Sequence, residues 1–62
     1  PEGAIKDFRQ EIGHDHQLLM QQLTLTLAAG DDLIAADCVR KLKFVDKLLE
    51  ELERFEDSLF ES

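Results

Sequence analysis

The residues best suited to chemistry in this chain begin with two histidines that flank Asp15, an arrangement that could hold a metal ion. Residues two apart on a helix point about 200° away from each other, so His14 and His16 cannot both reach one metal without breaking the helix. His16 instead continues an apolar arc from Ile12 to Leu19, and we expect it to lie at the edge of the core. No metal site is predicted.

The single cysteine and the C-terminal carboxylates give no better support for catalysis. Cys38 lies among apolar residues at helical spacing, where a free thiol behaves as a small hydrophobic side chain. No histidine is close to it in sequence to act as its base. The carboxylates of ELERFEDSLFES are typical of a solvated helix face. We therefore predict no catalytic residue, no cofactor and no enzymatic activity.

A basic run around one aromatic residue is the most unusual feature, because the net charge of the chain is −7. The segment AADCVRKLKFVDKL, residues 35–48, contains Arg40, Lys41, Lys43 and Lys47 around Phe44. The acidic balance of the chain disfavours a nucleic-acid or nuclear-localisation patch. Two interpretations remain open: an ordinary solvated helix face, and a protein-binding hot spot in which the cations steer a partner toward Phe44.

The solvated-face interpretation predicts ion pairs between residues four apart on one helix, each contributing about 0.2–0.5 kcal/mol. These pairs are Asp37–Lys41, Lys47–Glu51 and Glu50–Arg54. The hot-spot interpretation predicts a partner that presents an apolar pocket edged by acidic side chains.

The length of the chain limits how much core it can build. Sixty-two residues form one domain at most, and so short a chain buries only about 60% of the surface that it exposes when unfolded. With one cysteine and no zinc-type cluster, neither disulfides nor a metal can add stability. Because the chain opens on Pro1 rather than methionine, we expect a piece of a longer protein, completed by oligomerisation or by a neighbouring segment.

Composition also bounds location and partners. The chain has no run of 18 apolar residues, so no membrane span is predicted. Fourteen acidic against seven basic residues argue against nucleic-acid or anionic-membrane partners. One unpaired thiol is consistent with a reducing, cytoplasmic compartment.

Good helix formers dominate the sequence and its only proline is terminal, so we predict an all-α chain. The one strong break is LAAGDDL, where Gly30 can end a helix and Asp31 or Asp32 can cap the next. Two helices, about 3–29 and 32–58, should therefore form an antiparallel hairpin. Gly13 should weaken the first helix by about 1 kcal/mol and could allow a bend.

Each predicted helix carries an apolar face for the other. The residues expected on the first face are Ile5, Phe8, Ile12, Leu19, Leu23 and Leu27. Those on the second, which Glu56 interrupts, are Cys38, Leu42, Val45, Leu49, Leu52 and Leu59. On the second helix, Phe44, Leu48 and Phe55 form a further stripe that one partner helix cannot cover. On the first helix, Leu18 and Leu25 lie away from its apolar face. We expect an incomplete bundle that needs a third helix or a second copy of the chain.

The segment 35–48 also carries a resemblance to a known family. Ala35-Ala36-Asp37, Val39-Arg40-Lys41-Leu42, Phe44 and Asp46-Lys47-Leu48 form a motif that, with the looser HDHQLLMQQL at 14–23, is similar to the C-terminal domain of the HscB family. Members of that family are J-type co-chaperones of iron–sulfur cluster assembly. The resemblance covers roughly residues 4–60 and implies a three-helix bundle, of which this chain would supply the last two helices.

The resemblance also implies a function. In that family the C-terminal domain binds the cluster scaffold protein IscU, and an N-terminal J-domain stimulates the ATPase of the HscA chaperone through a His-Pro-Asp loop. Residues 1–62 contain neither that loop nor a J-domain, and we interpret them as a partial C-terminal domain. Phe44 matches the scaffold-contacting aromatic of the family, and we assign Phe44, Lys41 and Leu48 as partner-binding residues. The alternative is an oligomerisation element that does not bind the scaffold on its own.

Overall fold

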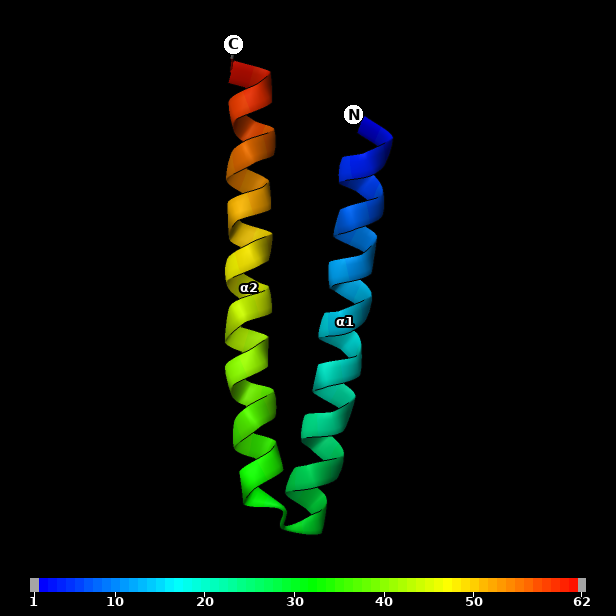
Figure 1. Ribbon diagram of the computed structural model, residues 1–62, viewed down its shortest axis with the longest axis vertical. Helices are drawn as coiled ribbons and strands as arrows, with labels where there is room; N and C mark the ends of the chain where they lie inside the picture. The colour runs from blue at the N-terminus through cyan, green and yellow to red at the C-terminus, as the bar shows by residue number, and fades with distance from the viewer. Residues whose placement is uncertain (1, 62) are drawn as a thin grey trace.

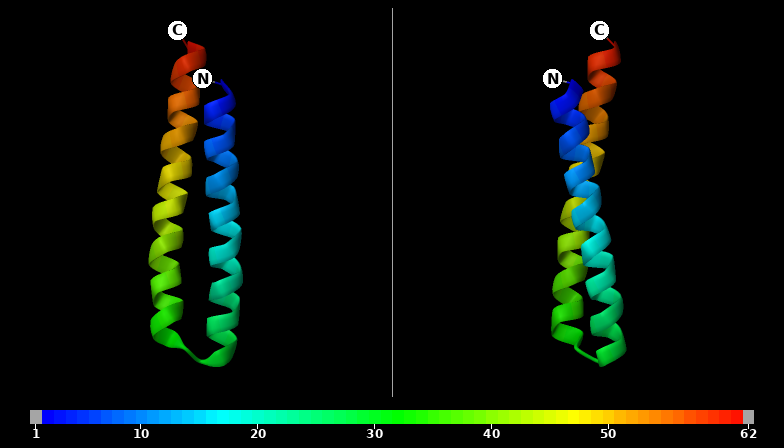
Figure 2. Two further views of the ribbon diagram at one scale, coloured as in Figure 1. Left: turned by 45° about the vertical axis from the view of Figure 1, so that its right-hand side comes forward. Right: turned by 90° about the vertical axis from the view of Figure 1, so that its right-hand side faces the viewer.

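The computed structural model describes residues 2–61, which form two antiparallel helices (Figure 1). Helix α1 comprises Glu2–Ala29 and helix α2 comprises Asp32–Glu61. The two lie side by side from the turn to the open end and cross at a small angle (Figure 2), in a molecule of 49 × 17 × 10 Å. The predicted all-α hairpin is confirmed, and α2 continues three residues beyond the predicted end at 58.

The turn between the helices has the backbone geometry that the sequence predicts. Gly30 has a φ of 75°, in the left-handed region that glycine adopts without steric cost. The amide of Gly30 donates to the carbonyl of Leu27 at 3.2 Å and that of Asp31 donates to Thr26 at 2.9 Å. This pair of hydrogen bonds is a Schellman motif, which satisfies carbonyls at the end of α1.

Asp31 then begins α2 as its N-cap. The amide of Ile34 donates to Asp31 Oδ1 at 3.4 Å, and the amide of Ala35 donates to the Asp31 carbonyl at 3.0 Å. Of the two candidate caps, Asp31 makes the capping contact. Asp32 lies in the first turn, where its negative charge interacts favourably with the helix dipole.

The core is a narrow seam between the two helices. Its buried hydrophobic residues are Ile12, Ala35, Cys38, Leu42, Val45 and Leu52. Helix α2 supplies five of these six, and all six except Ala35 were predicted. The other predicted positions Ile5, Leu19, Leu23 and Leu49 are half-buried. Ala35 was not predicted, because its small side chain leaves little trace in a hydrophobic pattern.

Three residues predicted for the core are exposed instead, namely Phe8 at 46%, Leu27 at 59% and Leu59 at 53%. Phe8 lies at the margin of the seam, where a two-helix interface gives cover on one side only. Leu27 lies beside the turn, where α2 has only just begun. Leu59 lies at the open end, where it lines a water-filled hollow with Ile5 and Lys6 of α1.

Gly13 causes no break, since α1 runs without interruption from Glu2 to Ala29. A Cβ atom added at Gly13 would meet nothing within 4 Å. Gly13 therefore lowers the stability of α1, because glycine loses more backbone entropy than alanine in a helix. No close contact at this position requires a residue without a side chain.

We predict that Gly13→Ala will stabilise the hairpin by about 1 kcal/mol, because alanine loses less backbone entropy on helix formation and the site has room for a methyl group. A higher midpoint in urea unfolding would show this. Gly30→Ala is the matched control and should lower the midpoint, because the φ of 75° is strained for alanine. A lower midpoint for Gly13→Ala would mean that the glycine has a structural role.

Candidate functional site

One face of the hairpin is hollowed by a groove of about 430 Å³. Its walls come from both helices and are mainly apolar, with three polar side chains. The lining residues are Ile12, Asp15, Leu18, Leu19, Gln22, Lys41, Phe44, Val45 and Leu48. Leu18 from α1 and Phe44 from α2 are 49% and 64% exposed, so large apolar surfaces on both walls are in contact with water.

The groove brings together all three residues that the sequence assigned to partner binding. Lys41, Phe44 and Leu48 lie on one side of α2 because steps of three and four residues keep side chains on one helix face. Lys41 Nζ lies 3.0 Å from Asp37 Oδ2 one turn earlier, an ion pair that holds the ammonium group near the groove. Their role in binding stays a prediction, but they share one surface.

Helix α1 supplies the opposite wall, which the sequence analysis largely missed. Asp15, Leu18 and Gln22 repeat the same three-and-four spacing on α1. Leu18 was recognised as lying off the core arc, whereas Asp15 and Gln22 were not singled out for this wall. An antiparallel alignment of residues 15–22 with residues 41–48 would have identified Asp15 and Gln22 as part of this wall. Phe55, assigned to the same stripe as Phe44, does not line the groove and is 52% exposed nearer the open end.

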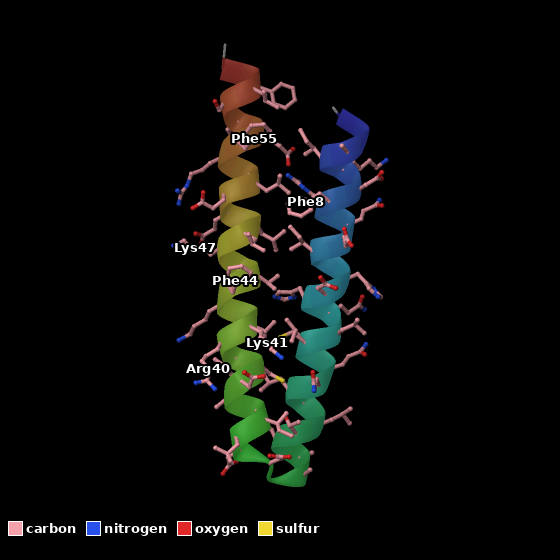
Figure 3. The ribbon with its side chains drawn as sticks, viewed as in Figure 1. Phe8, Arg40, Lys41, Phe44, Lys47 and Phe55 are labelled. Atoms are coloured by element: carbon pink, nitrogen blue, oxygen red, sulfur yellow. The ribbon has the colours of Figure 1, made fainter. Side chains whose placement is uncertain are left out.

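The basic run does not form one patch around Phe44. Figure 3 shows Lys41 beside the space between the helices, whereas Arg40 and Lys47 project from the side of α2 that faces away from α1. Two of the three predicted ion pairs form, since Arg54 and Glu50 lie 4.0 Å apart and Asp37 pairs with Lys41. The predicted Lys47–Glu51 pair is wrong: no such contact forms in the described part of the chain.

The histidines lie apart, as the helical geometry requires. His14 is exposed, while His16 is half-buried and its Nε2 lies 3.3 Å from Asp46 Oδ1 on α2. His16 therefore occupies the predicted core edge and makes a contact between the helices. Within residues 2–61, no three His, Cys, Asp or Glu side chains are grouped so as to hold a metal ion.

Cys38 is only 2% exposed and packs within the seam as a free thiol. A sulfur atom buried to this extent is not accessible to a substrate, so its role in this structure is packing. No helix in the described range has the long apolar stretch that a bilayer crossing needs.

A second hollow of about 520 Å³ lies at the open end of the hairpin and contains the ion pair between Arg9 and Glu56. The sequence analysis treated Glu56 only as an interruption of the α2 seam. In the structure its buried Oε1 atom is matched by the Arg9 guanidinium from α1. Arg9 was missed because it lies 47 positions away and only the register of the hairpin makes it a neighbour.

A protein-family model described as the HSCB C-terminal oligomerisation domain matches residues 2–53, most of the chain. The chain belongs to the HscB family. It is 87% identical over all 62 residues to the co-chaperone protein HscB homolog of Aeromonas hydrophila. It is also 43% identical to the homolog of Photobacterium profundum over 61 residues and 45% identical to that of Shewanella baltica over 64 positions.

This HscB-family chain spans little more than a third of those relatives. It covers 36% of the Aeromonas and Photobacterium proteins and 37% of the Shewanella protein, while 98% or more of the chain is matched in each. No solved structure matches the chain significantly. The family match confirms the resemblance that residues 35–48 carry.

We predict that Arg9→Gln will destabilise this HscB-family hairpin more than Glu56→Gln, because Arg9→Gln leaves a partly buried carboxylate without its cation. The coupling of the two residues should be about 0.5–1 kcal/mol, reduced by solvent because the Arg9 side chain is half-exposed. Urea unfolding of both single variants and the double variant measures this coupling. Additive effects would show that the pair contributes nothing to stability.

Proposed function

We propose that this chain recruits an IscU-type scaffold protein of iron–sulfur cluster assembly to an HscA-type chaperone, and that the scaffold contacts Phe44 at the margin of the groove between α1 and α2. The observation that carries the proposal is the exposure of Phe44, 64% accessible on the wall of an apolar groove. It supports the scaffold contact that the family resemblance implies for the aromatic residue of the last helix.

The geometry suits protein binding energetically. Burying a fully exposed phenylalanine contributes about 1.5–3 kcal/mol, and Phe44 retains most of that potential. Phe44 sits in the middle of a helix, so its backbone is already ordered and binding has little further entropy to remove. An aromatic anchor of this kind, with Lys41 and Asp15 nearby, resembles the centre of a typical interface hot spot.

The proposed mechanism is non-enzymatic delivery. In this proposal the hairpin would act as part of a C-terminal domain that holds the scaffold, while a J-domain of the co-chaperone would act on the chaperone ATPase. The family supports a co-chaperone role, and the names of the relatives agree with it. The free, buried thiol of Cys38 is consistent with the cytoplasmic setting that we propose.

We predict that Phe44→Ala in the full-length co-chaperone will weaken scaffold binding about tenfold or more, because it removes the largest exposed apolar side chain of the groove. Isothermal titration calorimetry against the purified IscU-type scaffold measures the affinity. Phe60→Ala is the control, since Phe60 is 83% exposed on the same helix but borders the open-end hollow. Equal affinity for wild type and Phe44→Ala would remove Phe44 from the site.

A second candidate function is self-association, which the description of the matching family as an oligomerisation domain favours. A second copy of the chain would then cover Leu18 and Phe44 in a four-helix arrangement. The isolated chain should sediment as a dimer or larger species at micromolar concentration, and Leu18→Asp should shift it toward monomer. A folded monomer at every concentration would contradict this function while leaving scaffold docking intact.

A further inference from the structure

The outward side of α2 carries four basic residues in a line, which we name the basic strip: Arg40, Lys43, Lys47 and Arg54. Steps of three, four and seven residues place them on one helix face that spans about 21 Å. All four are exposed, and Figure 3 shows Arg40 and Lys47 pointing away from α1. The strip holds four of the seven basic residues of the chain.

The charge of the strip is poorly neutralised within the molecule. Neither Lys43 nor Lys47 has a carboxylate within 4.0 Å among the residues that the structure describes. Arg40 lies 3.9 Å from Asp37 and Arg54 lies 4.0 Å from Glu50, and the arginine side chains are 76% and 74% exposed. Such long, solvated pairs are worth little, so the cations remain available to an external partner.

The strip is also set apart from an acidic background. The segment 40–47, which holds three residues of the strip and Lys41, contains four cations and one acid, Asp46, for a net charge of +3, so the rest of this −7 chain carries −10. A positive segment inside a negative molecule produces a local field that can orient an approaching partner.

Position links the strip to the groove. Arg40 precedes Phe44 by one helical turn, Lys43 is its neighbour in sequence and Lys47 follows three residues later. The strip therefore runs along the outer edge of the wall that Phe44 forms. A protein seated on Phe44 from that side would bring its own rim over the strip.

We propose that the basic strip is a steering surface for an acidic protein surface, and that carboxylates around the apolar contact region of the partner meet Arg40, Lys43 and Lys47 as it docks. This inference rests on the proposed function, because it concerns the same groove. Charges at the rim of an interface mainly raise the association rate and set its salt dependence, whereas the buried anchor sets the dissociation rate.

The acidic surroundings favour carboxylates of a protein over a continuous polyanion. Glu50 and Glu51 interrupt the strip before Arg54, and the segment from residue 50 to 61 is strongly acidic. A nucleic acid lying along α2 would bring its phosphates close to these carboxylates beyond Lys47, where Arg54 is the only basic residue in the sequence, and would be repelled. A folded partner with a few discrete acids can match Arg40, Lys43 and Lys47 and leave the acidic segment uncovered.

Stopped-flow association of the full-length co-chaperone with the IscU-type scaffold, at 25 to 500 mM salt, tests the inference. The double variant Lys43→Gln/Lys47→Gln should associate about three- to tenfold more slowly at low salt, with a flatter salt dependence and little change in dissociation rate. Lys6→Gln is the control for loss of a cation, because Lys6 lies on α1 at the open-end hollow. Far-UV circular dichroism confirms that each variant is folded.

The outcomes separate the two proposals. If Phe44→Ala accelerates dissociation but the double variant associates like Lys6→Gln at every salt concentration, the strip has no steering role and the groove function stands. If the double variant associates more slowly while Phe44→Ala leaves the affinity and both rates unchanged, the steering role of the strip is supported and the proposed scaffold contact at Phe44 is wrong. Wild-type protein that does not bind the scaffold overturns both. A 20-base-pair DNA duplex that binds through Lys43 and Lys47, with scaffold association unchanged, overturns the protein-partner inference.

Discussion

Two helices can bury only the strip of side chains that each turns toward the other, and this limit determines the surface of the hairpin. Six hydrophobic residues are buried in the seam, while twelve large hydrophobic residues are exposed in the described range. The apolar surface exceeds what one interface can cover, and part of the excess collects in the groove between Leu18 and Phe44. A contiguous apolar surface of this kind commonly marks a binding site.

Helix α2 serves three surfaces at once because successive residues turn by about 100°. One face holds Cys38 and Leu42 in the seam, the next presents Phe44 to the groove, and the outward face carries Lys43 and Lys47. The apolar anchor and the cations are therefore fixed relative to each other by a single rigid element. In the proposed function, this arrangement would hold a partner through Phe44 and orient it through charge without any movement of the backbone.

In the described part of the chain, polar contacts between the helices are few, and the two ion pairs that join them involve no residue that lines the groove. His16 meets Asp46 at the edge of the seam, and Arg9 meets Glu56 near the open end. Packing of the seam side chains into the facing helix already limits sliding of one helix along the other. These two pairs, 10 residues apart along α2, favour one register and so keep the walls of the groove in line.

Local signals in the sequence were sufficient for the helices, the turn and most of the α2 seam. Gly30 and Asp31 act within a few residues of themselves, and the repeat of Cys38, Leu42 and Val45 needs only helical periodicity. The family motif at residues 35–48 was equally local. The exposure of Phe8, Leu27 and Leu59 could not be read in this way, because it depends on whether the other helix reaches them.

The sequence by itself determined two amphipathic helices, the place where they turn and the side of α2 on which Phe44 lies, since backbone preferences and periodicity act over a few residues. Only the tertiary structure decided that Asp15 and Gln22 face Lys41 across a groove, and that Arg9 matches the carboxylate of Glu56. The tertiary structure also decided that Lys41 lies beside the space between the helices, whereas Arg40 and Lys47 project away from α1 into solvent. These outcomes depend on the register and crossing of two helices, which are set by packing between residues far apart in the chain.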